Sequence, residues 1–187
     1  SIGAGFSSAG GALGDISLRE RNLLGKGQDL RVGLTIAQTQ QQVDLSFTEP
    51  YFLDKPLAAG FDVYSRRTDY TDESSYQERE LGGGLRAGYN MQPRLRHTVS
   101  YKLVRQEITD VPSTASIVVR SQDGVATTSA IGNEFFYDAL NRRFDPSDGY
   151  FMKYGIDLAG FGGSTRFIRN SAGAGFYVPF FGSSVVG

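Results

Sequence analysis

The stretch from Arg21 to Tyr51 contains two short runs in which apolar and polar residues alternate with a period of two. Successive side chains of a β-strand point to opposite faces, so each run predicts a strand with one apolar face and one polar face. The apolar positions are Leu30, Val32, Leu34 and Ile36 in the first run and Val43, Leu45 and Phe47 in the second. We expect these strands to form a hairpin, with residues 38–42 as the connection.

The same alternation recurs along the chain and predicts about ten strands and the stub of an eleventh. Besides the two runs above, the predicted strands cover residues 1–9, 12–22, 57–67, 78–89, 95–109, 127–137, 150–160 and 167–178, with the stub at Val185 and Val186. Turn-like connections are expected near Gly10, Pro50, Pro93 and Asp145, and long ones at 68–77 and 110–124, the second with short structure of its own around 117–119. This pattern predicts an all-β antiparallel meander.

Composition narrows the class of protein. The 187 residues suit one sizeable domain, and a net charge of -1 gives no electrostatic case for nucleic acid. There is no cysteine, so neither a disulfide framework nor a thiolate metal site is expected. No run of about 18 apolar residues could form a transmembrane helix, but a barrel strand crosses a membrane with about 9–11 residues, half of them polar. Because Ser1 and its neighbours lack the basic and apolar parts of a signal peptide, we expect a mature or excised segment.

Alternating strands occur both in soluble barrels or sandwiches and in transmembrane barrels. The pattern is nearly the same in both, because the two classes differ only in which face meets the solvent. A soluble ligand-binding barrel therefore stays open as an alternative. Three features favour the membrane: many strands, polar faces richer in arginine than lysine, and aromatic residues near strand ends, where an interfacial girdle would lie. The membrane prediction requires lipid at the faces that carry Leu34, Leu45 and Phe61.

Three motifs carry a resemblance to a known family. Together, and in this order, they resemble the BamA family of outer-membrane protein assembly factors, within the Omp-insertase superfamily that also holds two-partner secretion transporters. The motifs are Glu20 to Gly27, Phe47 to Phe52, and Tyr137 to Tyr150, the last including Asn141-Arg142-Arg143-Phe144-Asp145-Pro146. The resemblance covers nearly the whole chain and implies one domain, 1–187: part of a transmembrane β-barrel of about sixteen strands, without POTRA domains and without the C-terminal strands.

The resemblance also implies a mechanism. In the family, a substrate strand pairs with the exposed edge of the first barrel strand at a weak seam, the lateral gate, which is a form of β-augmentation. Here the pairing edge would be Ile2, Gly3, Ala4, Gly5, Phe6 and Ser7, whose glycines suit a seam that opens; alternatively, those glycines only relieve crowding or kink the strand. Backbone groups would do the work, so no catalytic side chain, cofactor or metal is expected.

The implied location is the outer membrane of a Gram-negative bacterium. The implied partners are outer-membrane lipid, nascent β-barrel proteins, the remainder of the barrel or another chain for closure, and accessory assembly lipoproteins. A passive outer-membrane pore or two-partner secretion channel of the same build is the alternative function. His97, the single histidine, lies on a predicted strand beside Leu95 and Val99 and is expected to be a lipid-interface or packing residue rather than a catalytic base.

Overall fold

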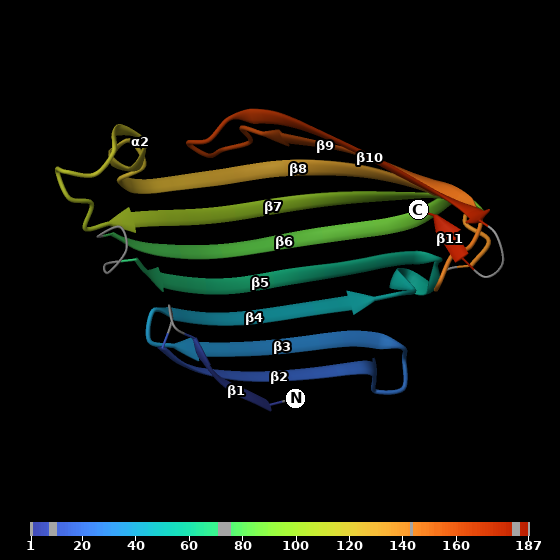
Figure 1. Cartoon of the computed structure of the whole chain (residues 1–187), viewed down its shortest axis with the longest axis horizontal. Helices are drawn as coiled ribbons and strands as arrows, with labels where there is room; N and C mark the ends of the chain where they lie inside the picture. The colour runs from blue at the N-terminus through green and yellow to red at the C-terminus, as the bar shows by residue number, and fades with distance from the viewer. Residues whose placement is uncertain (1, 8–10, 71–75, 143, 181–183, 187) are drawn as a thin grey trace.

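The computed structural model describes residues 2–7, 11–70, 76–142, 144–180 and 184–186. In these residues eleven strands form one sheet, in which each strand lies beside its neighbours in sequence (Figure 1). All pairings are antiparallel, so the predicted meander is confirmed. The strands are β1 Ile2–Ser7, β2 Gly11–Leu23, β3 Gln28–Ala37, β4 Gln40–Glu49, β5 Leu57–Asp69, β6 Gln77–Gln92, β7 Leu95–Thr109, β8 Gly124–Asp138, β9 Gly149–Ala159, β10 Phe167–Phe180 and β11 Ser184–Val186.

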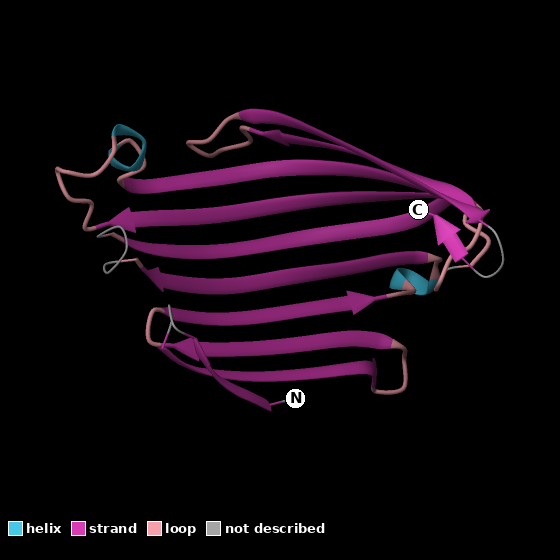
Figure 2. Ribbon diagram, viewed as in Figure 1, coloured by secondary structure: helices cyan, strands magenta, loops and turns pink. Residues whose placement is uncertain are grey.

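Two short helical segments lie in the connections (Figure 2). The 3-10 turn η1 Phe52–Asp54 follows β4, and α2 Ile117–Arg120 lies between β7 and β8, where short structure was predicted. The Ser116 side chain caps α2 by accepting a hydrogen bond from the backbone N–H of Val119. In the part of the chain that the structure describes, no helix is long and apolar enough to span a bilayer.

The sheet has almost no buried core. Among the described residues, the only buried hydrophobic side chains are those of Ile108 and Ala130. The chain exposes 12948 Å² of surface, whereas a compact protein of this mass exposes about 8,800 Å². No second layer formed by the described residues therefore covers the apolar face, as one would in a soluble sandwich.

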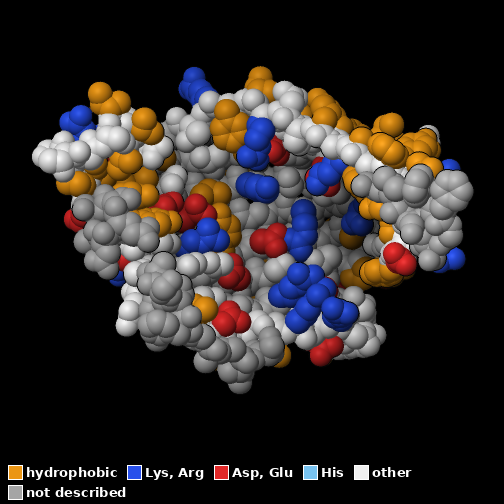
Figure 3. All heavy atoms as spheres, in the orientation of Figure 1, with side chains coloured by type: hydrophobic (Ala, Val, Ile, Leu, Met, Phe, Trp, Pro, Cys, Tyr) orange, Lys and Arg blue, Asp and Glu red, His pale blue; other side chains and the backbone are white. Residues whose placement is uncertain are grey.

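The two faces of the sheet differ in charge and in crowding. Charged side chains gather over the central strands of the hollowed face in Figure 3, which we call the concave face. Five ion pairs lie on this face among the described residues: Arg19–Asp29, Arg31–Asp29, Arg86–Asp62, Lys153–Glu134 and Arg169–Asp157. Glycine is needed here at Gly82, because a Cβ atom would overlap the ring of Tyr64, whereas the opposite, convex face leaves ordinary space at Gly83.

The predicted strand ends needed several corrections. The connection predicted at 38–42 is wrong: β3 ends at Ala37 and β4 begins at Gln40, with Gln41 opposite Ile36. Polar glutamines continue the strand because strand pairing uses backbone groups, which do not depend on side-chain polarity. The strand β5 likewise runs past Arg67 to Asp69. The strand β6 continues through the turn predicted at 90–93 and ends at Gln92 after a bulge.

Candidate functional site

The predicted pairing edge forms a short strand at one end of the sheet. Residues Ile2 to Ser7 make up β1, which pairs with β2 in a register that sets Ile2 opposite Ile16 and Ser7 opposite Gly11. The strand β1 reaches only to Ile16, although β2 continues to Leu23. Among the described residues no strand pairs with the other side of β1. Alternate residues of a strand direct backbone N–H and C=O groups to opposite sides, so this side of β1 can accept a partner strand.

The opposite end of the sheet is also open among the described residues. The strand β10 pairs with β9 from Phe167 to Tyr177, while on its other side β11 covers only Val178 to Phe180. The described strands β1 and β11 do not pair with each other. An uncovered sheet edge in lipid leaves backbone groups without hydrogen-bond partners, at a cost of several kcal/mol for each group. Among the described residues, both outer edges of the sheet are therefore uncovered over most of their length.

The first two motifs lie at one rim of the sheet, on the right in Figure 1. In the turn between β2 and β3, Gly25 and Gly27 adopt φ angles of 72° and 70°, which glycine tolerates without strain. The Asn22 side chain accepts a hydrogen bond from Gly27 N at 2.7 Å. Gln28 then donates to a Glu49 carboxylate oxygen at 2.6 Å, which joins the two motifs.

The third motif stabilises the connection between β8 and β9 at the same rim. The Asn141 side-chain oxygen accepts hydrogen bonds from the backbone N–H groups of Ser147 at 3.1 Å and Asp148 at 3.2 Å. Its amide nitrogen donates to Ser147 Oγ at 2.8 Å. Gly149 follows with a φ of 108°. The motif residues described here therefore organise turns, and their contacts indicate a structural role.

An arginine joins three strands on the concave face. Arg86 on β6 forms an ion pair with Asp62 on β5, and its Nη2 donates to Thr48 Oγ1 on β4 at 2.5 Å. The same nitrogen donates to the backbone oxygen of Phe47 at 3.3 Å. A side chain at Gly60 would collide with this guanidinium group. The paired charges therefore lie on the concave face, which would line the interior of a barrel, and a polar interior is typical of transmembrane barrels.

The convex face carries an uncovered apolar band. Leu85 and Leu81 are 62% and 57% exposed, and Phe61 and Leu45, on which the membrane prediction depends, are each 36% exposed. Single exposed apolar residues are common in soluble proteins, but a continuous apolar surface of this extent marks a protein or membrane interface. The prediction that Leu34, Leu45 and Phe61 do not form a packed centre is therefore confirmed.

Aromatic residues and arginines bound this band at its two rims. On β6, Tyr89 lies toward the rim that holds the two-residue turn between β6 and β7, which we call the turn rim. Arg79 lies toward the opposite rim, which holds the connections from β5 to β6 and from β7 to β8 and which we call the loop rim. The two residues are ten positions apart (89 − 79) on the same face. At about 3.3 Å per residue and a tilt of about 40°, ten residues span roughly 25 Å along the membrane normal. That height matches the apolar band of a transmembrane barrel, about 25 Å.

His97 lies in the aromatic row at the turn rim. Its ring stacks on Phe135 with centroids 4.4 Å apart and meets the Tyr89 ring edge-on at 5.4 Å. Its two ring nitrogens lie 3.0 Å from the Tyr89 hydroxyl and 3.2 Å from Asn133 Oδ1. These contacts support the packing role that the sequence predicted for this histidine.

A group of arginines on the convex face was not predicted from the sequence. Arg67, Arg79 and Arg105 share this face with Leu81 and lie near the loop ends of β5, β6 and β7. The sequence did indicate the face of Arg67, because this residue continues the alternation that passes through Phe61. The prediction ended a strand at Arg67 and began the next at Glu78, so the two arginines were not recognised as direct neighbours.

Comparison with known proteins identifies a family match and several similar proteins. Residues 22–187 match the Omp85 superfamily domain. The chain is 29% identical over 185 residues to the outer membrane protein assembly factor BamA of Neorickettsia risticii, covering 99% of this chain and 25% of that protein. It is 24% identical to a SAM50-like protein of Drosophila melanogaster, covering 88% of this chain and 38% of that protein.

A solved structure shares the fold. The crystal structure of Haemophilus ducreyi BamA lacking POTRA domains 1–3 superposes with a TM-score of 0.72 at 18% identity, covering 95% of this chain and 37% of that one. This chain thus corresponds to a minor part of the length of each of these proteins. The open meander, the apolar convex face and the match over residues 22–187 agree, and the chain belongs to the Omp85 superfamily.

Proposed function

We propose that this chain forms the first part of an outer-membrane barrel that folds and inserts β-barrel proteins, in the outer membrane of a Gram-negative bacterium. Its family membership and its likeness to assembly factors support this role. The observation that carries the proposal is the side of β1 that no described strand covers, at the end of a sheet whose convex face is apolar.

In this proposal β1 is the lateral-gate strand, and it receives a strand of the nascent barrel protein by β-augmentation. Each backbone hydrogen bond contributes about 1 kcal/mol net in water, and more where water is excluded. A partner strand along six residues could form about six such bonds, enough to hold a substrate but not to trap it. The remaining strands of the barrel and accessory lipoproteins would close and regulate the seam.

Cross-linking in the full-length protein tests this proposal, because the chain described here has no cysteine of its own. Single cysteines are placed along β1 and paired with single cysteines in the last strand of a stalled barrel substrate. We expect cross-links at β1 that follow one strand register. Val99, on the central strand β7, provides the matched control position and should give none.

The outcomes separate the assembly role from that of a passive pore or secretion channel. A set of β1 cross-links in one register supports strand pairing. Conductance through the full-length protein without any cross-link at β1 would instead support the pore and refute the gate.

A further inference from the structure

We propose that Arg67, Arg79 and Arg105 bind the phosphate group of an anionic lipid headgroup at the loop rim of the convex face. This inference requires that the convex face meets lipid, but it does not depend on the assembly activity or on the gate. We call these three residues the arginine corner.

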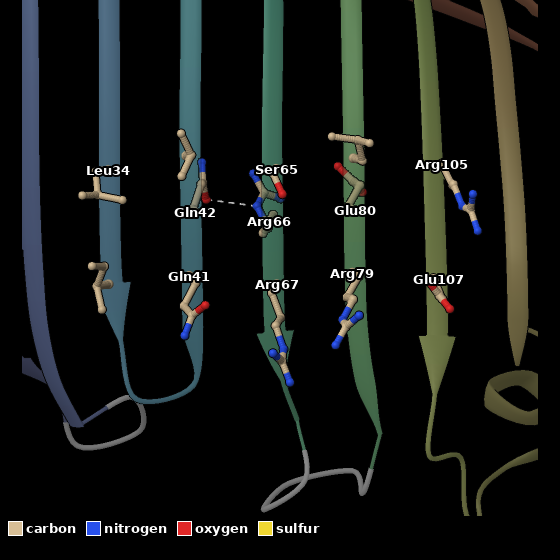
Figure 4. Close-up of a pocket in the computed structure, with 13 residues that line it drawn as sticks. Leu34, Gln41, Gln42, Ser65, Arg66, Arg67, Arg79, Glu80, Arg105 and Glu107 are labelled. Atoms are coloured by element: carbon tan, nitrogen blue, oxygen red, sulfur yellow. Dashed lines mark hydrogen bonds between the residues drawn. The ribbon is translucent and has the colours of Figure 1, made fainter.

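Strand register brings the arginine corner together. Arg67 lies directly opposite Arg79, Arg79 lies opposite Glu107, and Arg105 lies opposite Leu81, one row closer to the apolar band. Figure 4 shows the three guanidinium groups directed toward the loop ends of β5, β6 and β7. All three arginines are exposed, whereas Glu107 is only partly so.

The charges of the corner are not balanced within the sheet. Arg79 and Arg105 form none of the ion pairs found among the described residues, and Arg67 donates only to the neutral Gln77 side chain, at 3.1 Å. Among the described residues, two carboxylates lie on the same face near the corner, those of Asp69 and Glu107, against the three arginines. Like charges directly opposite each other destabilise a sheet, so the Arg67–Arg79 pair favours an anion between them.

The concave face provides an internal contrast. There, Arg19, Arg86 and Arg169 each hold a carboxylate on a neighbouring strand, at 2.5 Å for Arg19 and 2.6 Å for Arg169. On the convex face, by contrast, the arginines of the corner have fewer carboxylates near them than their number would require for neutrality. Their anionic partner therefore comes from outside the sheet.

The position of the corner selects a lipid as the source of that anion. Arg79 lies roughly 25 Å from the level of Tyr89 along the membrane normal, at the depth of a headgroup. An open groove beside the corner is lined by residues of β3 to β7 (Figure 4). Its apolar part is made by Leu34, Ile36, Val43 and Leu81, and its polar part includes Gln41, Ser65, Glu80 and Glu107 as well as the arginines. A groove whose apolar part lies next to arginines matches a molecule with an acyl chain below a phosphate. Guanidinium groups also bind phosphate oxygens in a bidentate manner, which strengthens the contact.

A tryptophan placed in the groove reports on this lipid locally. Leu81 is 57% exposed and the chain has no tryptophan, so Leu81→Trp adds one fluorophore beside the corner. The full-length protein with this change is inserted into vesicles of phosphatidylcholine and phosphatidylglycerol, with brominated acyl chains on one lipid at a time. The parent protein without the new tryptophan supplies the background. We expect phosphatidylglycerol to quench several-fold more strongly than its mole fraction predicts.

Charge removal then tests the arginines themselves. The triple variant Arg67→Gln, Arg79→Gln, Arg105→Gln should lower the local preference for phosphatidylglycerol roughly tenfold, since each arginine near a surface changes lipid binding about fivefold and the nearby carboxylates offset part of this. The matched control removes three exposed cations at the turn rim: Lys26→Gln, Lys55→Gln and Arg94→Gln. Both variants are made in the Leu81→Trp protein, and the control should keep the lipid preference that this protein shows.

The possible outcomes distinguish a lipid headgroup site from a free-anion site and from a face that does not meet lipid. Equal quenching by the two lipids, or a triple variant that behaves like the control, would overturn the headgroup site while leaving the membrane location intact. Loss of the preference in about 10 mM inorganic phosphate would identify a site for free anions and also overturn it. If neither lipid quenches the tryptophan, the convex face does not meet lipid, and the failure lies in the membrane location itself.

Discussion

Replacement of Leu85 by arginine places a charge near the middle of the apolar band. Leu85 lies four residues from Tyr89 and six from Arg79, so it lies roughly 10 Å from one rim and 15 Å from the other. Its side chain is 62% exposed on the convex face. An arginine near the midplane of a barrel costs about 2–4 kcal/mol. We therefore expect Leu85→Arg to lower the free energy of unfolding by about 3 kcal/mol.

Two further variants identify the origin of this loss. Leu81 lies only two residues from Arg79, so Leu81→Arg should cost about 1 kcal/mol, because the arginine can extend to the rim. Leu85→Phe should cost less than about 0.5 kcal/mol in fluid lipid, whereas a well-packed protein core would lose about 1–3 kcal/mol by overpacking. The assay is reversible urea unfolding of the full-length protein in phospholipid vesicles. Equal losses for both arginine variants, or a large loss for Leu85→Phe, would refute the lipid-facing assignment.

Three other predictions use contacts in the sheet. In a proline scan along β1, the effect of substitution should alternate with a period of two, because every second N–H bonds to β2. Proline at those positions should impair folding, whereas proline at the positions between them should permit folding but slow substrate assembly about tenfold. An effect without this period would argue against strand pairing. Arg86→Met should cost about 1–3 kcal/mol in urea unfolding because it removes the contacts with Asp62 and Thr48; no change would mean that the three-strand junction is not stabilising. Gly82→Ala should cost about 1–3 kcal/mol because its methyl group overlaps a tyrosine ring, while the control Gly83→Ala on the other face stays within about 0.5 kcal/mol; equal effects would contradict the face assignment.

Much of the fold could be predicted because a strand with two different faces leaves a period-two signal. That signal gave the number of strands, the meander and the full extent of Leu95–Thr109. It failed where side-chain polarity changed while the backbone continued to pair, as at Gln40 and beyond Arg67. It could not distinguish lipid from a dry interior, because alternation is the same in both. The exposed area and the uncovered Leu81 and Leu85 show that the described chain itself does not bury this face.

The candidate site was predictable only in part. The pairing edge could be placed at Ile2 to Ser7 through the family resemblance, and the structure forms a strand there, one side of which pairs with no other described strand. Its gating role stays a prediction. The arginine corner was not predicted, because it depends on the pairing of Arg67 with Arg79. The long connection between the two predicted strands gave no indication of this register.

Spin-label accessibility along residues 98–103 of β7 tests most directly whether lipid covers the convex face. Single nitroxides are compared for collision with oxygen, which partitions into lipid, and with a water-soluble nickel chelate. We predict oxygen accessibility at Val99, Tyr101 and Leu103, with exclusion of nickel. Nickel should instead reach Thr98, Ser100 and Lys102. Exclusion of both reagents from Val99, Tyr101 and Leu103, or access of nickel to all six positions, would contradict the transmembrane sheet.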